Sequence, residues 1–188
     1  MCYQNEQGGL VKFRLVYDGR LPSASNSSRK REKHDIRKSV HQQLLQFVQV
    51  RAAVEDRHQI KSRRFHVGIF DFIPLVTKQH AVTCHLDILF LRSGQPGSHI
   101  IGGDLDNRLK TLFDALRIPH NENELPPDSF PEEDEDPFRC LLEDDSLITA
   151  HSVTTDRLLV PAQKADDVRL IIQVQIEPVV RGEGNLGF

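Results

Sequence analysis

Residues 81–92, with the sequence AVTCHLDILFLR, carry the most regular hydrophobic pattern in the chain. Apolar side chains recur at every second position from Val82 to Phe90. Successive side chains of a β-strand point to opposite faces, so this spacing predicts a strand with one face in the core. The stretch therefore indicates a sheet as the centre of the fold.

Elements on both sides of this stretch complete the predicted architecture. Alternating or β-branched residues predict further strands at 10–17, 65–76, 146–159 and 168–177. Apolar stripes at helical spacing predict helices at 32–54 and 105–117. This order predicts an α+β (mixed) fold in one domain, residues 1–188, with a single mixed β-sheet and two main helices packed on it.

Composition excludes several classes of protein. No apolar run approaches the roughly 18 residues of a membrane span, and we expect a cytoplasmic protein. The three cysteines lack C-x-x-C spacing, which argues against a disulfide framework or a structural zinc site. No P-loop or Rossmann glycine pattern is present, so no nucleotide cofactor is expected, and the histidines are scattered without ligand spacing.

Charge is distributed unevenly behind a net value of −3. Residues 121–145 hold eleven acids and one base, whereas residues 12–64 hold fourteen Lys or Arg and five Asp or Glu. The acidic, proline-rich part, about 119–140, predicts a mobile inserted loop, and the tail at about 180–188 is predicted to be flexible. A basic body is compatible with a phosphate-bearing partner.

The segment GGDLDNRLK, residues 102–110, is the first candidate for chemistry. Asp104 and Asp106 are two residues apart, so in an extended segment entering a helix their carboxylates point the same way. Lys110 follows Asp106 by one helical turn. Hard oxygen ligands at this density suit Mg²⁺ or Mn²⁺. The alternative is structural, with an aspartate as helix N-cap and Asp106 in an ordinary ion pair with Lys110.

The segment LLEDDSLIT, residues 141–149, is the second candidate. Glu143, Asp144 and Asp145 are consecutive carboxylates that repel one another, and a bound cation would relieve that repulsion. The alternative is that the three residues merely end the solvated acidic loop. The residues alone leave open which of the three carboxylates belongs to a site.

Together these segments resemble the RusA-like Holliday junction resolvase (crossover junction endodeoxyribonuclease) family. The resemblance rests on DLDN-x-x-K-x-x-x-DAL at 104–116, the following Asp144–Asp145 pair, and a weaker match at 19–23. It implies a homodimeric, Mg²⁺- or Mn²⁺-dependent endonuclease that cuts branched DNA in recombination and repair. The residues that match the family's metal ligands are Asp104, Asp106 and Asp145; Lys110 matches its essential lysine, and Asn107, Asp114 and Asp144 are the supporting candidates.

The helix predicted after residue 29 supplies the candidate DNA contacts, which are Arg29, Lys30, Arg31, Lys33, Arg37 and Lys38. The long acidic connection 117–143 departs from the family pattern, and it leads to the hypothesis that an acidic strip occupies the DNA channel. Two alternatives remain: a non-catalytic nucleic-acid-binding module, and a protein-interaction module that uses the acidic loop on a basic partner, each with a structural acidic cluster.

Overall fold

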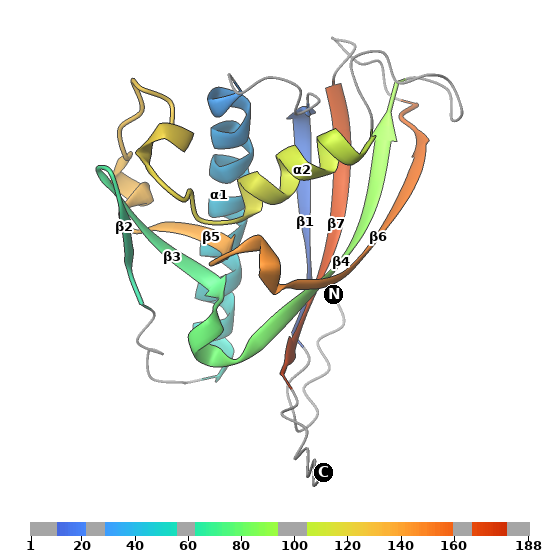
Figure 1. Cartoon of the computed structure of the whole chain (residues 1–188). Helices are drawn as coiled ribbons and strands as arrows, with labels where there is room; N and C mark the ends of the chain where they lie inside the picture. The colour runs from blue at the N-terminus through green and yellow to red at the C-terminus, as the bar shows by residue number, and fades with distance from the viewer. Residues whose placement is uncertain (1–10, 22–28, 56–62, 94–104, 160–166, 180–188) are drawn as a thin grey trace, which may run out of the picture.

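The computed structural model describes residues 11–21, 29–55, 63–93, 105–159 and 167–179 (Figure 1). Within these ranges the chain forms two α-helices, α1 and α2, and seven strands. None of the described helices holds a segment long and apolar enough to cross a membrane. The elements run β1 Val11–Arg20, α1 Lys30–Glu55, β2 Phe65–Val67, β3 Phe70–Val76, β4 Val82–Arg92, α2 Leu105–Leu116, β5 Phe138–Leu142, β6 Ile148–Arg157 and β7 Asp167–Pro178.

The larger sheet has four strands in the order β1-β7-β4-β6. Strand β4 pairs antiparallel with β7 and parallel with β6, so the sheet is mixed. The alternating residues predicted to face the core do so: Leu86, Ile88 and Phe90 are all buried. Both helices pack their apolar side chains into this same core. The predicted α+β class and the central role of 81–92 are therefore confirmed.

The prediction of one sheet is wrong, because strands β2, β3 and β5 form a second sheet. Residues 65–76 are a hairpin rather than one strand, since the chain turns at Gly68, whose φ is +60°. A short 3-10 turn, η1 at Lys78–His80, ends in the left-handed residue Ala81. This turn redirects the chain between β3 and β4, and the bend is visible in Figure 1.

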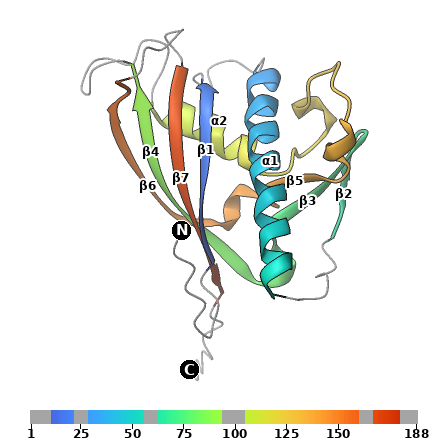
Figure 2. The same cartoon turned by 180° about the vertical axis from the view of Figure 1, so that it is seen from behind.

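Helix α1 lies between the two sheets, and Figure 2 shows it beside the edge strand β1. Its apolar residues Ile36, Val40 and Leu44 are buried, as their spacing predicted. The Gln43 side chain bonds both main-chain groups of Val16, accepting from the amide at 2.8 Å and donating to the carbonyl at 2.7 Å. Helix α1 therefore covers the free edge of β1.

The acidic loop is ordered, which corrects the prediction of a mobile insertion. It contains two 3-10 turns, η2 at Glu122–Glu124 and η3 at Glu133–Glu135, and it ends in strand β5. Leu125 is buried, and the Glu135 side chain is buried while accepting from the Glu132 amide at 3.0 Å. The loop folds because its acidic side chains find partners on α1, as described below.

A second, smaller core lies under this loop and encloses His34 of α1. The ring of His34 packs near Phe70 and Phe138, at 5.7 and 5.9 Å between centroids, and both ring nitrogens are buried without a partner. Burial, with help from the nearby cations Arg37 and Lys38, lowers the pKa of His34 from 6.5 to about 4. The imidazole is therefore neutral in the folded protein at neutral pH.

Because His34 is buried in its neutral form, we expect the protein to lose stability in mild acid. Below pH 6.5 the unfolded chain takes up a proton that folded His34 takes up only near pH 4, so the unfolding free energy falls across that window. We expect His34 to lower the unfolding free energy by an amount on the order of 2 kcal/mol across this window. In His34→Leu this part of the pH dependence, measured by urea unfolding, should be absent. His80→Gln, at an exposed position, serves as the control substitution. Equal profiles for wild type and His34→Leu would contradict this account.

Candidate active site

Helix α2 presents two of the predicted site residues on its exposed side. Its buried side consists of residues such as Leu109 and Leu112, which enter the main core. Asp106 and Lys110 are exposed and four residues apart, so they lie on one side of the helix, one turn from each other. Asp104, the remaining aspartate of the motif, lies outside the described residues.

The second acidic segment enters the site through a 3-10 turn, η4, at Asp145–Leu147. This turn follows β5 and leads directly into β6. It contacts both α2 and β4, and in Figure 1 it lies beside α2 as the orange turn before β6. The structure therefore brings the element that carries Asp145 against the element that carries Asp106 and Lys110.

Two of the three consecutive carboxylates hold the turn itself in place. Glu143 accepts a hydrogen bond from the Lys78 amide at 3.0 Å. Asp144 is the N-cap of η4: it accepts from the Ser146 amide at 3.0 Å and from the Ser146 hydroxyl. The bonds from Ser146, with the nearby Lys78 and His120, lower the pKa of Asp144. Asp144 is therefore a structural support of the turn.

Asp145 differs from both neighbours, because its side chain is exposed and engaged by neither turn nor sheet. Within the part of the chain that the structure describes, the side chains of Asp145, Asp106 and Lys110 make no hydrogen bond or ion pair. Two carboxylates and one ammonium are thus left available to a ligand. Of the three consecutive carboxylates, only that of Asp145 is without a partner among the described residues.

The described residues fit a metal site only in part. Carboxylate oxygens without protein partners are the donors that Mg²⁺ and Mn²⁺ take. Among the described residues, no group of three or more His, Cys, Asp or Glu side chains is arranged to hold a metal ion. Asp106 and Asp145 are two of the three predicted ligands, and the third, Asp104, belongs to the segment that is not described. A complete site therefore requires Asp104.

Asp114 has partners other than Lys110. Its carboxylate accepts from Lys33 at 2.6 Å and from Arg117 at 3.2 Å, and these two cations lower its pKa against the opposing effect of burial. Asp114, one of the supporting candidates, therefore links α2 to α1. Asn107 is exposed, and its carbonyl accepts from the Thr111 hydroxyl at 3.1 Å inside the helix.

An ion network connects α1, α2 and the acidic loop behind the site. Arg37 is only 1% exposed; it donates to the Asp114 carbonyl at 2.9 Å and lies 3.9 Å from Glu124. Glu124 also accepts two hydrogen bonds from Arg117, at 3.1 and 3.3 Å. Glu124 of the loop thus sits between two buried guanidinium groups, which explains why this part of the loop is fixed.

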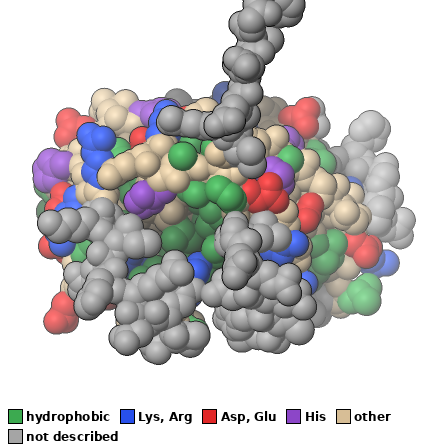
Figure 3. All heavy atoms as spheres, turned by 90° about the horizontal axis from the view of Figure 1, so that it is seen from below, with side chains coloured by type: hydrophobic (Ala, Val, Ile, Leu, Met, Phe, Trp, Pro, Cys, Tyr) green, Lys and Arg blue, Asp and Glu red, His purple; other side chains and the backbone are tan. Residues whose placement is uncertain are grey.

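The basic face of α1 is largely occupied by the acidic loop, which corrects part of the predicted DNA-contact set. Arg37 is wrong as a DNA contact because its side chain is buried. Lys33 is bound to Asp114, and Lys38 pairs with Glu132 and Glu135. Arg31 is exposed and lies 3.9 Å from Asp128. On the lower face of the molecule, away from the start of α1, basic and acidic side chains are interspersed (Figure 3). Arg29 and Lys30 remain as candidates.

His151 is a neighbour of the site that the sequence did not reveal. It pairs in register with Leu86 of β4 and so lies on the helix-covered side of β6. Its ring meets Phe113 of α2 edge-on, at 5.3 Å between centroids. Phe113 follows Lys110 by three residues, on the same side of the helix. In the sequence, the position of His151 two residues before Val153 was the sole indication that both side chains lie on the same face of the strand.

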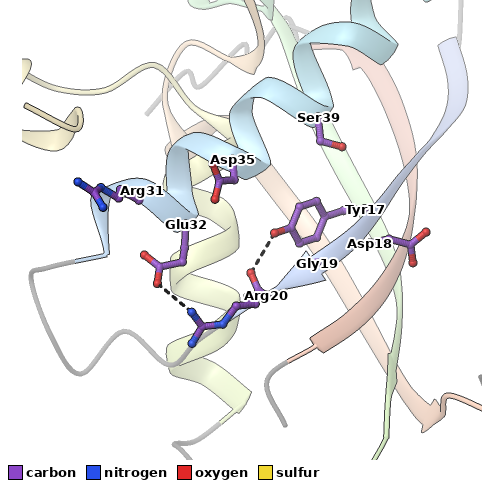
Figure 4. Close-up of a pocket in the computed structure, with 8 residues that line it drawn as sticks. All are labelled: Tyr17, Asp18, Gly19, Arg20, Arg31, Glu32, Asp35 and Ser39. Carbon is purple, nitrogen blue, oxygen red and sulfur yellow. Dashed lines mark hydrogen bonds and ion pairs between the residues drawn. The ribbon is translucent and has the colours of Figure 1, made fainter. Parts of the chain in front are cut away.

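A separate polar cavity of about 580 Å³ lies between the end of β1 and the start of α1 (Figure 4). Tyr17 donates to the Arg20 carbonyl across it at 3.0 Å, and Arg20 lies 3.8 Å from Glu32. Gly19 is required there, because a Cβ would lie 2.6 Å from the Tyr17 hydroxyl. None of the lining residues belongs to α2 or η4, so this cavity is distinct from the candidate site.

Comparisons with protein-family models, with curated proteins and with solved structures found no match. The resemblance to RusA-like resolvases therefore rests on the motif residues alone.

Proposed function

We propose that the chain is a metal-dependent endonuclease whose active site lies where α2 meets η4. One observation carries the proposal: Asp106, Lys110 and Asp145 are exposed and without partners among the described residues, on two elements in contact. The neighbouring acids Glu143, Asp144 and Asp114 are all engaged in holding the fold. Carboxylates and an ammonium without protein partners are available to bind a metal ion and a phosphate.

Each residue has a role in this proposal. Asp106 and Asp145, with Asp104 from the motif, would hold Mg²⁺ or Mn²⁺. When bound, such a cation polarises a phosphoryl oxygen and activates water for attack on phosphorus. Lys110 lies one helical turn from Asp106 and would place its ammonium beside the phosphate, where it stabilises the negative charge that develops during displacement. His151 and Phe113 contact each other edge-on, and Phe113 lies one turn after Lys110 on α2.

The substrate follows from the resemblance. Branched DNA is the first substrate to test, with the chain acting as a homodimer in the cytoplasm during recombination or repair. The pairing of α1 with the acidic loop indicates that the basic face of this helix is not the main DNA surface. DNA phosphates would then be held by Arg29 and Lys30 together with residues nearer the α2–η4 site.

Asp144 and Asp145 provide a matched pair of carboxylate-to-amide changes. We expect Asp145→Asn to lower metal-dependent cleavage by at least about 100-fold without a change in stability. Loss of a residue that only hydrogen-bonds a metal ligand typically costs about 10–100-fold in activity, and loss of the ligand itself should cost at least as much. Asp144→Asn should keep the cap, because Asn is as good an N-cap as Asp, and should retain cleavage within about tenfold. Cleavage rates and urea unfolding test both variants. Loss of cleavage in Asp144→Asn with full activity in Asp145→Asn would reverse the assignment.

A further inference from the structure

The free edges of three strands in the two sheets are short or covered. At the edge of β1, the Gln43 side chain bonds the main chain of Val16. At the edge of β5, the Arg139 amide donates to the His41 ring at 2.7 Å, and the Ile118 amide donates to the Leu142 carbonyl at 3.0 Å. Strand β2 has only three residues. Such protection is usual, because an open edge pairs readily with another strand.

Strand β6 is different. It is ten residues long and lies at the end of the larger sheet, and among the described residues it pairs with β4 alone. Figure 1 shows it as the outermost strand, with no described element beyond it. Most of its side chains are exposed, and residues 148–155 contain no charge and no proline. The usual protections of an edge, lysine, proline and cover by a helix, are therefore missing along most of its length.

We propose that β6 pairs antiparallel with β6 of a second copy of this chain, across a two-fold axis near Ser152. A symmetric antiparallel pair must place one residue opposite its own copy, and Ser152 lies at the middle of the strand. Ala150 then lies opposite Thr154, and His151 opposite Val153. The charged residues at the end, Asp156 and Arg157, face other residues rather than their own copies.

The sequence of β6 favours its own copy over a charged partner. In this register Ser152 meets Ser152 and Thr149 meets Thr155, and such hydroxyl pairs across strands are favourable. No like charges oppose each other. The two-fold axis is perpendicular to the sheet, so the four strands of each copy continue into one sheet of eight. Both α2–η4 sites then lie on the same face of that sheet.

A charge at the centre of the strand tests this interface. We expect the wild type to sediment at twice the 21.5 kDa mass of the chain over a concentration series. Ser152→Lys places two ammonium groups opposite each other and should raise the dimer Kd at least about tenfold. The variant should still fold, because Ser152 lies beside the Asp87 carboxylate at 2.7 Å. Gln46→Lys, at an exposed position of α1, adds the same charge elsewhere and should leave the dimer intact.

Cross-linking tests the register. Ser152→Cys should form an intermolecular disulfide on mild oxidation, because directly opposed Cα atoms in an antiparallel pair are about 4.5–5.5 Å apart. Gln46→Cys should not. A monomeric wild type would overturn the proposal. So would an equal dimer Kd for Ser152→Lys and Gln46→Lys. This inference rests on the homodimer of the proposed function and adds its interface. Neither experiment uses DNA or metal, so a failure of the interface leaves the cleavage test of the α2–η4 site to be decided separately.

Discussion

Asp106→Asn is expected to lower Mg²⁺-dependent cleavage of a four-way DNA junction by at least about 100-fold. The amide keeps the shape of the side chain but replaces a charged carboxylate oxygen by a neutral one. Mg²⁺ binds carboxylate oxygens in preference to neutral amide oxygens. Asp106 is exposed and has no partner among the described residues, so the fold should be unaffected. DNA affinity should be unchanged or slightly tighter, since a negative charge near the phosphates is lost.

The rate is best measured in single turnover on a labelled junction, with affinity measured separately in Ca²⁺ or a chelator. Glu133→Gln is a matched control, because it removes one negative charge from an exposed residue of the acidic loop. It should cleave like the wild type. Full activity in Asp106→Asn, or an equal loss in both variants, would show that Asp106 is not a ligand.

Glu124→Gln is expected to have the largest effect on stability. It leaves the guanidinium groups of Arg37 and Arg117, both buried, without the carboxylate that lies between them. Breaking a buried ion pair by removing one partner costs about 3–5 kcal/mol, and because Glu124 is partly exposed we expect about 3 kcal/mol. The midpoint of urea unfolding should therefore fall markedly.

Asp128→Asn is the control for this prediction. Asp128 belongs to the same loop, and its carboxylate also lies 3.9 Å from an arginine, Arg31, but both side chains are largely exposed. An exposed ion pair contributes about 0–1 kcal/mol, so this variant should unfold close to the wild-type midpoint. Similar, small losses in both variants would show that the buried network is not what fixes the loop.

The sequence predicted the larger sheet and both helices well, because their hydrophobic periods are long and regular. Residues 81–92 and 168–177 alternate over five or more apolar positions, and α1 repeats its stripe over three turns. Strand β5 was missed because its five residues, FRCLL, follow an acidic proline-rich stretch and show no alternation. The second sheet depends on backbone turns at Gly68 and Ala81, of which only the glycine leaves a local sequence signal.

The acidic loop could not be predicted from its own composition. Its acids are held by residues of α1 that lie about 90 positions away in the sequence, such as Lys38 with Glu132. Arg37, by contrast, could have been placed correctly. It precedes Val40 by three residues and Leu44 by seven, so it belongs to the buried stripe of the helix rather than to its basic face.

The α2 part of the candidate site comes from the sequence, and the structure adds which carboxylate of the η4 segment is without a partner. Asp106 and Lys110 follow from helical spacing, which the sequence contains. The choice of Asp145 over Asp144 depends on which carboxylate caps the turn, and that is a property of backbone geometry. His151 comes to lie against Phe113 of α2 through the parallel pairing of β6 with β4, which links residues 65 positions apart.

The central claim is tested most directly by incubating the purified chain with labelled four-way, forked and linear DNA duplexes, in Mg²⁺ or Mn²⁺ and in a chelator. We predict cleavage of branched DNA in the presence of the metal, little cleavage of the linear duplex, and none in the chelator. Intact branched DNA in both metals, or cleavage that persists in the chelator, would contradict the proposal that Asp106, Lys110 and Asp145 form a metal-dependent nuclease site.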